Sequence, residues 1–256
     1  MTGLEVAVRF VHLASVLLLV GSFSFELLVS RPAFKNAFLD FPSFYRALLS
    51  IARLSLLLAI GTAIFGLFIK IADATGLPLA ESIDLGTIIN VLTETRFGVV
   101  WLVRMALFCL LALVLSGEFF GWFKSDSVWL RVAEFVLSAT LLMAMTAAGH
   151  ASAAEGMTLF IQLAMDGLHL LAAGVWLGGL IPLAMLLSWA KSTREPSTLI
   201  IAQEATAMFS RLGFTSVAVL LVTGFFNAWY LVGGIPPLSG RTTDISSSQS
   251  SASLFP

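Results

Sequence analysis

Residues 4–29, LEVAVRFVHLASVLLLVGSFSFELLV, decide the fold of this chain. The hydrocarbon core of a bilayer is about 30 Å thick and takes roughly 20 helical residues, so an apolar run of this length predicts a membrane-spanning helix. Its few polar residues share one helical stripe, which predicts that this stripe faces the inside of a bundle. Five further apolar runs follow along the chain: residues 48–71, 97–115, 128–148, 158–187 and 214–232.

The composition agrees with a protein that lies mostly in lipid. Hydrophobic residues make up 58% of the 256 positions and charged residues 11%, with a mean hydropathy of +0.97. Backbone groups in lipid must be hydrogen-bonded within their own segment, and the runs are too apolar for barrel strands. The predicted fold is therefore an all-α, polytopic membrane helix bundle with about six transmembrane helices. A net charge of -1 without a basic run excludes nucleic acid as a partner.

The basic residues predict which way the helices cross the membrane. Lys and Arg are more frequent in every second loop, whereas the loops between them are acidic or carry no basic residue. By the positive-inside rule, the N-terminus, the acidic loop 73–95 and the loop 149–157 are expected outside. The loops expected in the cytoplasm carry Arg31, Lys35, Arg46, Lys124, Lys191, Arg194 and Arg211.

The composition changes abruptly near the end of the chain. The sequence GGIPP at residues 233–237 leads into a stretch with six serines between Ser246 and Ser253. Such a segment buries too little apolar surface to order itself. We therefore expect one transmembrane domain, residues 1–235, and a disordered Ser-rich tail, residues 236–256.

The three histidines are the strongest indication of chemistry. With the orientation above, His12, His150 and His169 all lie in the outer half of the bundle, where ionisable residues are costly and are functional candidates by default. Imidazole nitrogens and methionine thioethers are donors that copper prefers, Cu(I) especially. We therefore expect one copper site, Cu(I) or Cu(II), made by the three histidines with Met157 and Met165. Hydrogen bonding of the histidines across helix pairs, and packing of the methionines, are the structural alternatives.

Two further expectations concern charged side chains inside the apolar runs. Asp166 is expected to pair with Arg9 or Arg104 in the outer half, because an unpaired buried carboxylate is costly. Glu26 is expected near the inner end of the first span, solvated from the cytoplasm.

Several catalytic motifs are missing from the sequence. It has no GxxxxGK[ST] loop, no HExxH helix and no GxSxG turn. The chain is therefore predicted not to be an enzyme, and any transport would depend on a gradient or a partner.

The run DGLHLLAAGVWLGGL at residues 166–180 resembles the signature helix of the CopD/PcoD family of bacterial copper-resistance membrane proteins. The segments RFVH at residues 9–12 and AGHA at 148–151 agree with that family in order and spacing. The resemblance implies a multi-pass protein of the bacterial inner membrane that imports or accepts copper, in concert with a periplasmic CopC-like copper-binding partner. It also implies functional roles for His12, His150 and His169.

The resemblance ends before the C-terminus. Members of the family usually continue past the sixth span with two more membrane helices, so a shortened C-terminus is expected here. The principal alternative function is a b-type cytochrome-like protein in which two of the histidines bind haem b axially. A third is a scaffold whose histidines only pack.

Overall fold

The computed structural model describes residues 3–36, 42–76, 78, 84–122, 127–148, 156–193 and 195–232. Helices make up nearly all of these ranges, and no strand occurs in them, so the all-α prediction is confirmed. The elements are α1 (Gly3–Phe25), η1 (Glu26–Ser30), α2 (Arg31–Asn36), α3 (Pro42–Thr75), α4 (Leu85–Glu94), α5 (Arg96–Phe119), α6 (Val128–Ala144), η2 (Thr146–Ala148), α7 (Gly156–Ala173), η4 (Gly174–Gly178), α8 (Gly179–Thr193) and α9 (Pro196–Val232).

Five helical segments are long and apolar enough to cross a membrane: residues 3–35, 43–75, 96–119, 159–193 and 196–229. They correspond to five of the six expected spans. The remaining expected span, 128–148, forms α6, which has 17 residues and carries two charged side chains, Arg131 and Glu134, in its first two turns. Because α6 packs against α1 and α5, it is part of the bundle.

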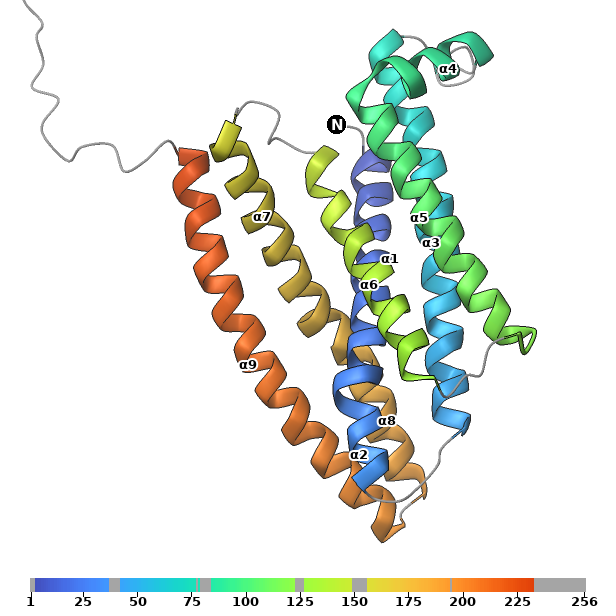
Figure 1. Ribbon diagram of the computed structural model, residues 1–256, viewed down its shortest axis with the longest axis vertical. Coiled ribbons are helices and arrows are strands. Elements are labelled where there is room, and N and C mark those ends of the chain that lie inside the picture. The colour runs from blue at the N-terminus through green and yellow to red at the C-terminus, as the bar shows by residue number, and fades with distance from the viewer. Residues whose placement is uncertain are drawn as a thin grey trace, which may run out of the picture.

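Helix α1 runs through the middle of the bundle. Figure 1 shows α7 and α9 on one side of it and α3 and α5 on the other, with α6 alongside. The N-terminus, α4 and the start of α7 lie at one end, which we call the upper end because it is uppermost in Figure 1. These are the segments expected outside, so the arrangement agrees with the charge pattern, and the orientation itself stays a prediction.

A close crossing of two glycines sets α1 against the α7–α8 segment. A Cβ atom placed on Gly21 would lie 2.0 Å from the backbone carbon of Gly178, and one placed on Gly178 would lie 2.1 Å from the carbonyl oxygen of Leu17. Only glycine allows backbones to approach this closely. Gly178 closes η4, a π-helical turn between α7 and α8.

The acidic loop contains a helix that the sequence reading did not predict. Asp84 caps α4 by accepting a hydrogen bond from the Thr87 backbone N–H at 3.0 Å, and Thr95 caps α5 by accepting one from the Gly98 N–H at 2.9 Å. The two helices meet tightly at Gly98, where a Cβ atom would lie 2.1 Å from the Val91 carbonyl oxygen. The Ser-rich tail lies outside the described residues.

Candidate functional site

His12 lies on α1 and is buried against α3 and α5. Its Nδ1 lies 3.0 Å from the Ala59 carbonyl oxygen and 2.9 Å from Thr62 Oγ1, both on α3. A carbonyl oxygen can only accept, and the Thr62 hydroxyl already donates to the Leu58 carbonyl at 2.6 Å. Nδ1 therefore carries the proton, and the lone pair of the neutral ring is on Nε2.

That lone pair is occupied by an arginine. Nη2 of Arg104, on α5, makes a short hydrogen bond to His12 Nε2. Because a guanidinium only donates, Nε2 accepts, in agreement with the proton on Nδ1. The Phe108 ring packs against the His12 ring at an interplanar angle of 78°, with the two centroids 6.2 Å apart. A metal ion could reach His12 Nε2 only if Arg104 moved away.

The Nδ1 atom of His169, like that of His12, is hydrogen-bonded to a threonine hydroxyl, but on the other side of the bundle. Its Nδ1 lies 2.9 Å from Thr223 Oγ1 of α9, and the Thr223 hydroxyl donates to the Val219 carbonyl oxygen at 2.7 Å. Nδ1 of His169 is therefore the donor, and in the neutral form of the ring the lone pair is on Nε2. No described residue hydrogen-bonds to that atom. A neutral imidazole held by its Nδ1–H is the usual form of a histidine that binds a metal through Nε2.

The remaining predicted donors differ in where they lie. Met165 is partly buried and precedes His169 by one helical turn, so the two share a face of α7. Met157 lies in the first turn of α7, roughly 18 Å above His169 along the helix. His150 lies outside the described residues.

The structure places His12 and His169 at the same level but does not bring their rings together. Each precedes the glycine of the close crossing by nine residues, from 12 to 21 and from 169 to 178, which is roughly 14 Å of helix. His12 faces α3 and α5, whereas His169 faces α9, and Figure 1 shows these helices on opposite sides of α1. Within the described ranges, no three His, Cys, Asp or Glu side chains form a group that could hold a metal ion.

The predicted pairing of Asp166 is wrong. Arg9 forms its ion pair with Glu5, one turn away, at 2.7 Å, and Arg104 faces His12. In the described part of the chain, no ion pair joins Asp166 to either arginine.

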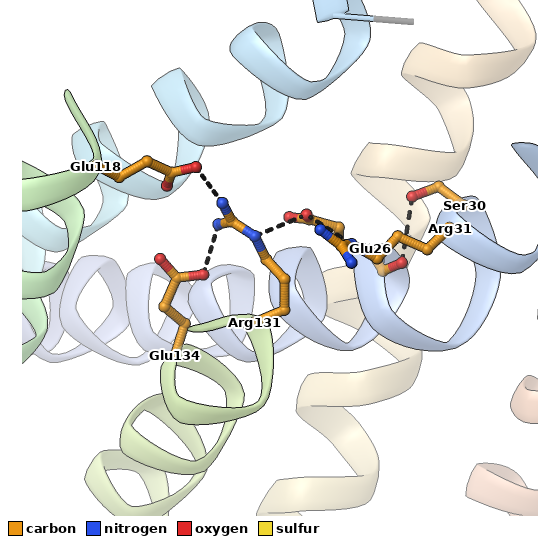
Figure 2. Close-up of polar contacts among 6 residues, drawn as sticks. All are labelled: Glu26, Ser30, Arg31, Glu118, Arg131 and Glu134. Atoms are coloured by element: carbon orange, nitrogen blue, oxygen red, sulfur yellow. Dashed lines mark hydrogen bonds and ion pairs between the residues drawn. The ribbon is translucent and has the colours of Figure 1, made fainter. Parts of the chain in front are cut away.

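A cluster of charged side chains lies at the lower end of the bundle and was not predicted. Arg131 of α6 is 1% exposed and contacts three carboxylates (Figure 2). Its Nη1 lies 2.6 Å from Glu134 Oε2, its Nε lies 3.0 Å from Glu26 Oε1, and its Nη2 makes a short contact with Glu118 Oε1. Arg31 approaches the same Glu26 oxygen at 3.5 Å. We call these five residues the buried charge cluster.

The expectation that Glu26 is solvated is therefore also wrong, because Glu26 is 1% exposed. Glu26 begins the π-helical turn η1, and single π turns inside helices are frequent at functional sites. A signal was present in the sequence: Arg131 and Glu134 are charged residues, three positions apart, inside an apolar run, which marks them as functional candidates in a membrane helix.

Comparison with known proteins gives a family match over most of the chain. The model of the family described as "Copper resistance protein D-like, N-terminal domain" matches residues 1–161. This range includes His12, Arg104 and the whole buried charge cluster, and it ends within α7, before His169. No solved structure matches the chain.

Three relatives are similar in sequence. The chain is 35% identical to the copper transport protein CutJ of Bacillus subtilis (strain 168) over 60% of its own length and 27% of that protein. It is 28% identical to copper resistance protein D of Pseudomonas syringae pv. tomato, over 93% of its own length and 72% of the relative. It is 29% identical to inner membrane protein YebZ of Escherichia coli (strain K12), over 56% and 45%. The chain thus spans about a quarter of CutJ and less than half of YebZ.

Proposed function

This chain belongs to the copper resistance protein D-like family, and from this premise we propose that it takes up copper at the upper end of the bundle and contributes to copper import across a bacterial inner membrane. Copper is the cargo in this account. The names of CutJ and of copper resistance protein D support copper, and the name of YebZ supports the inner membrane.

The free Nε2 of His169 is the observation that carries the proposal. Thr223 holds the orientation of its ring through Nδ1, and no described residue bonds to Nε2, as a copper ligand requires. Met165 on the same helical face supplies a soft thioether within one turn. His12 has the same chemistry, but Arg104 covers its lone pair, so we assign the primary site to His169.

The other predicted donors fit a path toward this site. Met157 lies in the first turn of α7, at the upper end, and His150 precedes it by seven positions in the sequence. We propose that they receive copper, which then moves down α7 to Met165 and His169. A periplasmic CopC-like protein is the proposed donor, because the charge pattern predicts that this end faces outside.

Metal analysis and an absorption spectrum of the purified full-length chain test the proposal. We expect a protein without a Soret band that binds about one equivalent of Cu(I) and loses most of it in His169→Ala. A Soret band would support the haem alternative, for which two rings must face each other across one iron atom. A colourless protein that takes up no copper would contradict both readings.

A further inference from the structure

We propose that the buried charge cluster binds one proton, which is held by Glu134 at the lower end of the bundle. The proposal concerns a site separate from the histidines. His12 and Glu26 are fourteen residues apart on α1–η1, and Arg104 and Glu118 are fourteen apart on α5. Both spacings correspond to roughly 21 Å of helix. The proposal does not depend on whether the chain binds copper.

The charges of the cluster do not balance when every group is ionised. Three carboxylates, on Glu26, Glu118 and Glu134, face two guanidiniums, on Arg131 and Arg31. An excess charge buried in a low-dielectric bundle is costly, and an acid in this position takes up a proton instead. Binding of one proton converts one carboxylate into a carboxylic acid and brings the cluster to neutrality.

The hydrogen-bonding pattern independently indicates that a proton is missing. Glu26 Oε2, Glu118 Oε2 and Glu134 Oε1 are buried and have no hydrogen-bond partner in the described part of the chain. Buried polar atoms are rarely left without partners, so three carboxylate oxygens that lack a hydrogen-bond donor favour the binding of a proton at this cluster.

Glu134 is the carboxylate best placed to hold the proton. Glu26 lies near two guanidiniums, Arg131 and Arg31, which favour its ionised form. Glu118 and Glu134 each contact one nitrogen of Arg131, and Glu134 is the more deeply buried, at 0% exposure against 9%. Burial favours the neutral acid, so the proton goes to Glu134.

Within the described ranges, no further charged side chain forms an ion pair with the three carboxylates. The described charged groups that contact Arg131 or its partner Glu26 from other elements are Glu118 of α5 and Arg31 of α2. Arg53 of α3 lies over the Phe119 ring, 5.1 Å from its centroid, rather than on a carboxylate of the cluster. Asp166 and His169 of α7 lie toward the upper end. Nor do the three carboxylates converge as a metal-holding group within the described ranges, which favours a proton over a metal cation.

Infrared spectroscopy of the full-length purified protein tests this site. A protonated carboxyl group has a carbonyl stretch well separated from the carboxylate bands, and the band shifts in deuterium oxide. At neutral pH, the spectrum of the parent minus that of Glu134→Gln should contain one such band. The matched control is Glu94→Gln, which changes an exposed glutamate of α4 and should give no protonated-carboxyl band.

A second variant tests the charge count. In Glu26→Gln one negative charge is lost, so Glu134 should release its proton and its band should disappear although Glu134 itself is unchanged. Glu134→Gln should fold like the parent, because the amide has the shape and charge of the protonated acid.

Three results would overturn the proposal: a difference spectrum of Glu134→Gln without the band, a band that persists in Glu26→Gln, or failure of Glu134→Gln to fold.

Discussion

His12 and His169 make a natural pair for comparison, because they sit at the same level of the bundle and use the same first hydrogen bond. In each, Nδ1 donates to a threonine on the neighbouring helix, Thr62 or Thr223, whose own hydroxyl is bonded to a carbonyl one turn back. The two sites differ in what lies beyond Nε2. Arg104 covers that atom in His12, whereas in His169 no described residue bonds to it.

The difference shows that burial and residue type do not identify a metal ligand by themselves. A threonine that fixes the ring prepares a histidine to bind metal only if the second nitrogen is left accessible. At His12 a threonine also fixes the ring, but Arg104 occupies the second nitrogen. His12 therefore links α1 to α3 and α5 through hydrogen bonds. We therefore expect changes around the two histidines to have different effects on copper.

The largest expected effect is the loss of stability on substitution of Gly178, at the close crossing of α1 and η4. In Gly178→Ala the new Cβ atom would lie 2.1 Å from the Leu17 carbonyl oxygen, so α1 and η4 must separate. We expect a loss of about 3 kcal/mol or more in the free energy of unfolding, measured by denaturant titration in detergent. Gly66→Ala is the matched control, since its Cβ would meet nothing within 4 Å, and equal stability of the two variants would contradict the role of the crossing.

The next largest effect should follow from removing one of the two threonines. Thr223→Val leaves His169 without the acceptor that fixes its ring, and copper affinity should fall by about 10- to 100-fold. Thr62→Val, the matched change at His12, should leave the affinity unchanged. Competition titration with a Cu(I) chelator measures both, and a larger loss in Thr62→Val would reverse the assignment of the site.

Copper binding should also weaken in acid. The ligand is the neutral imidazole of His169, and a proton on Nε2 competes with the metal. Affinity should therefore fall as the solution is acidified, by at most about tenfold per pH unit for one competing proton. Chelator competition at several pH values, with the chelator's own protonation taken into account, checks this. A pH-independent affinity would indicate that methionines alone bind the metal.

The smallest effect on the His169 site should come from a change at Arg104. Arg104→Met exposes His12 Nε2 without touching α7 or α9, so the first equivalent of copper should bind as in the parent. A second, weaker equivalent should appear at His12. Isothermal titration shows both, and loss of the first equivalent would mean that the two sites are linked.

The sequence predicted the fold well because its signals are local. Apolar runs such as residues 4–29 determine which segments span the bilayer, whereas the run 128–148 forms a shorter helix with charges in its first turns. The helical stripe of α1 also predicted that His12 and Glu26 point inward, as they do, whereas Arg9 on the same stripe is exposed.

The partners of these side chains could not be read from the sequence, because they lie on other helices. Arg104 contacts His12 across 92 positions, and Glu26 meets Arg131 across more than a hundred. Helix periodicity predicts which face of its own helix a residue lies on, but not which residue of another helix packs against that face. A single histidine site was therefore a reasonable expectation, while the separation of His12 from His169 required the packing of α1 against α3 and of α7 against α9.

The most direct test of this account is the copper stoichiometry of His12→Ala and His169→Ala, purified side by side as full-length proteins and loaded with Cu(I) under the same conditions. The account predicts that His169→Ala loses most of the bound copper and that His12→Ala keeps the parental amount. Parental copper in His169→Ala, or equal loss in both variants, would contradict the claim that the free Nε2 of His169 is the copper ligand.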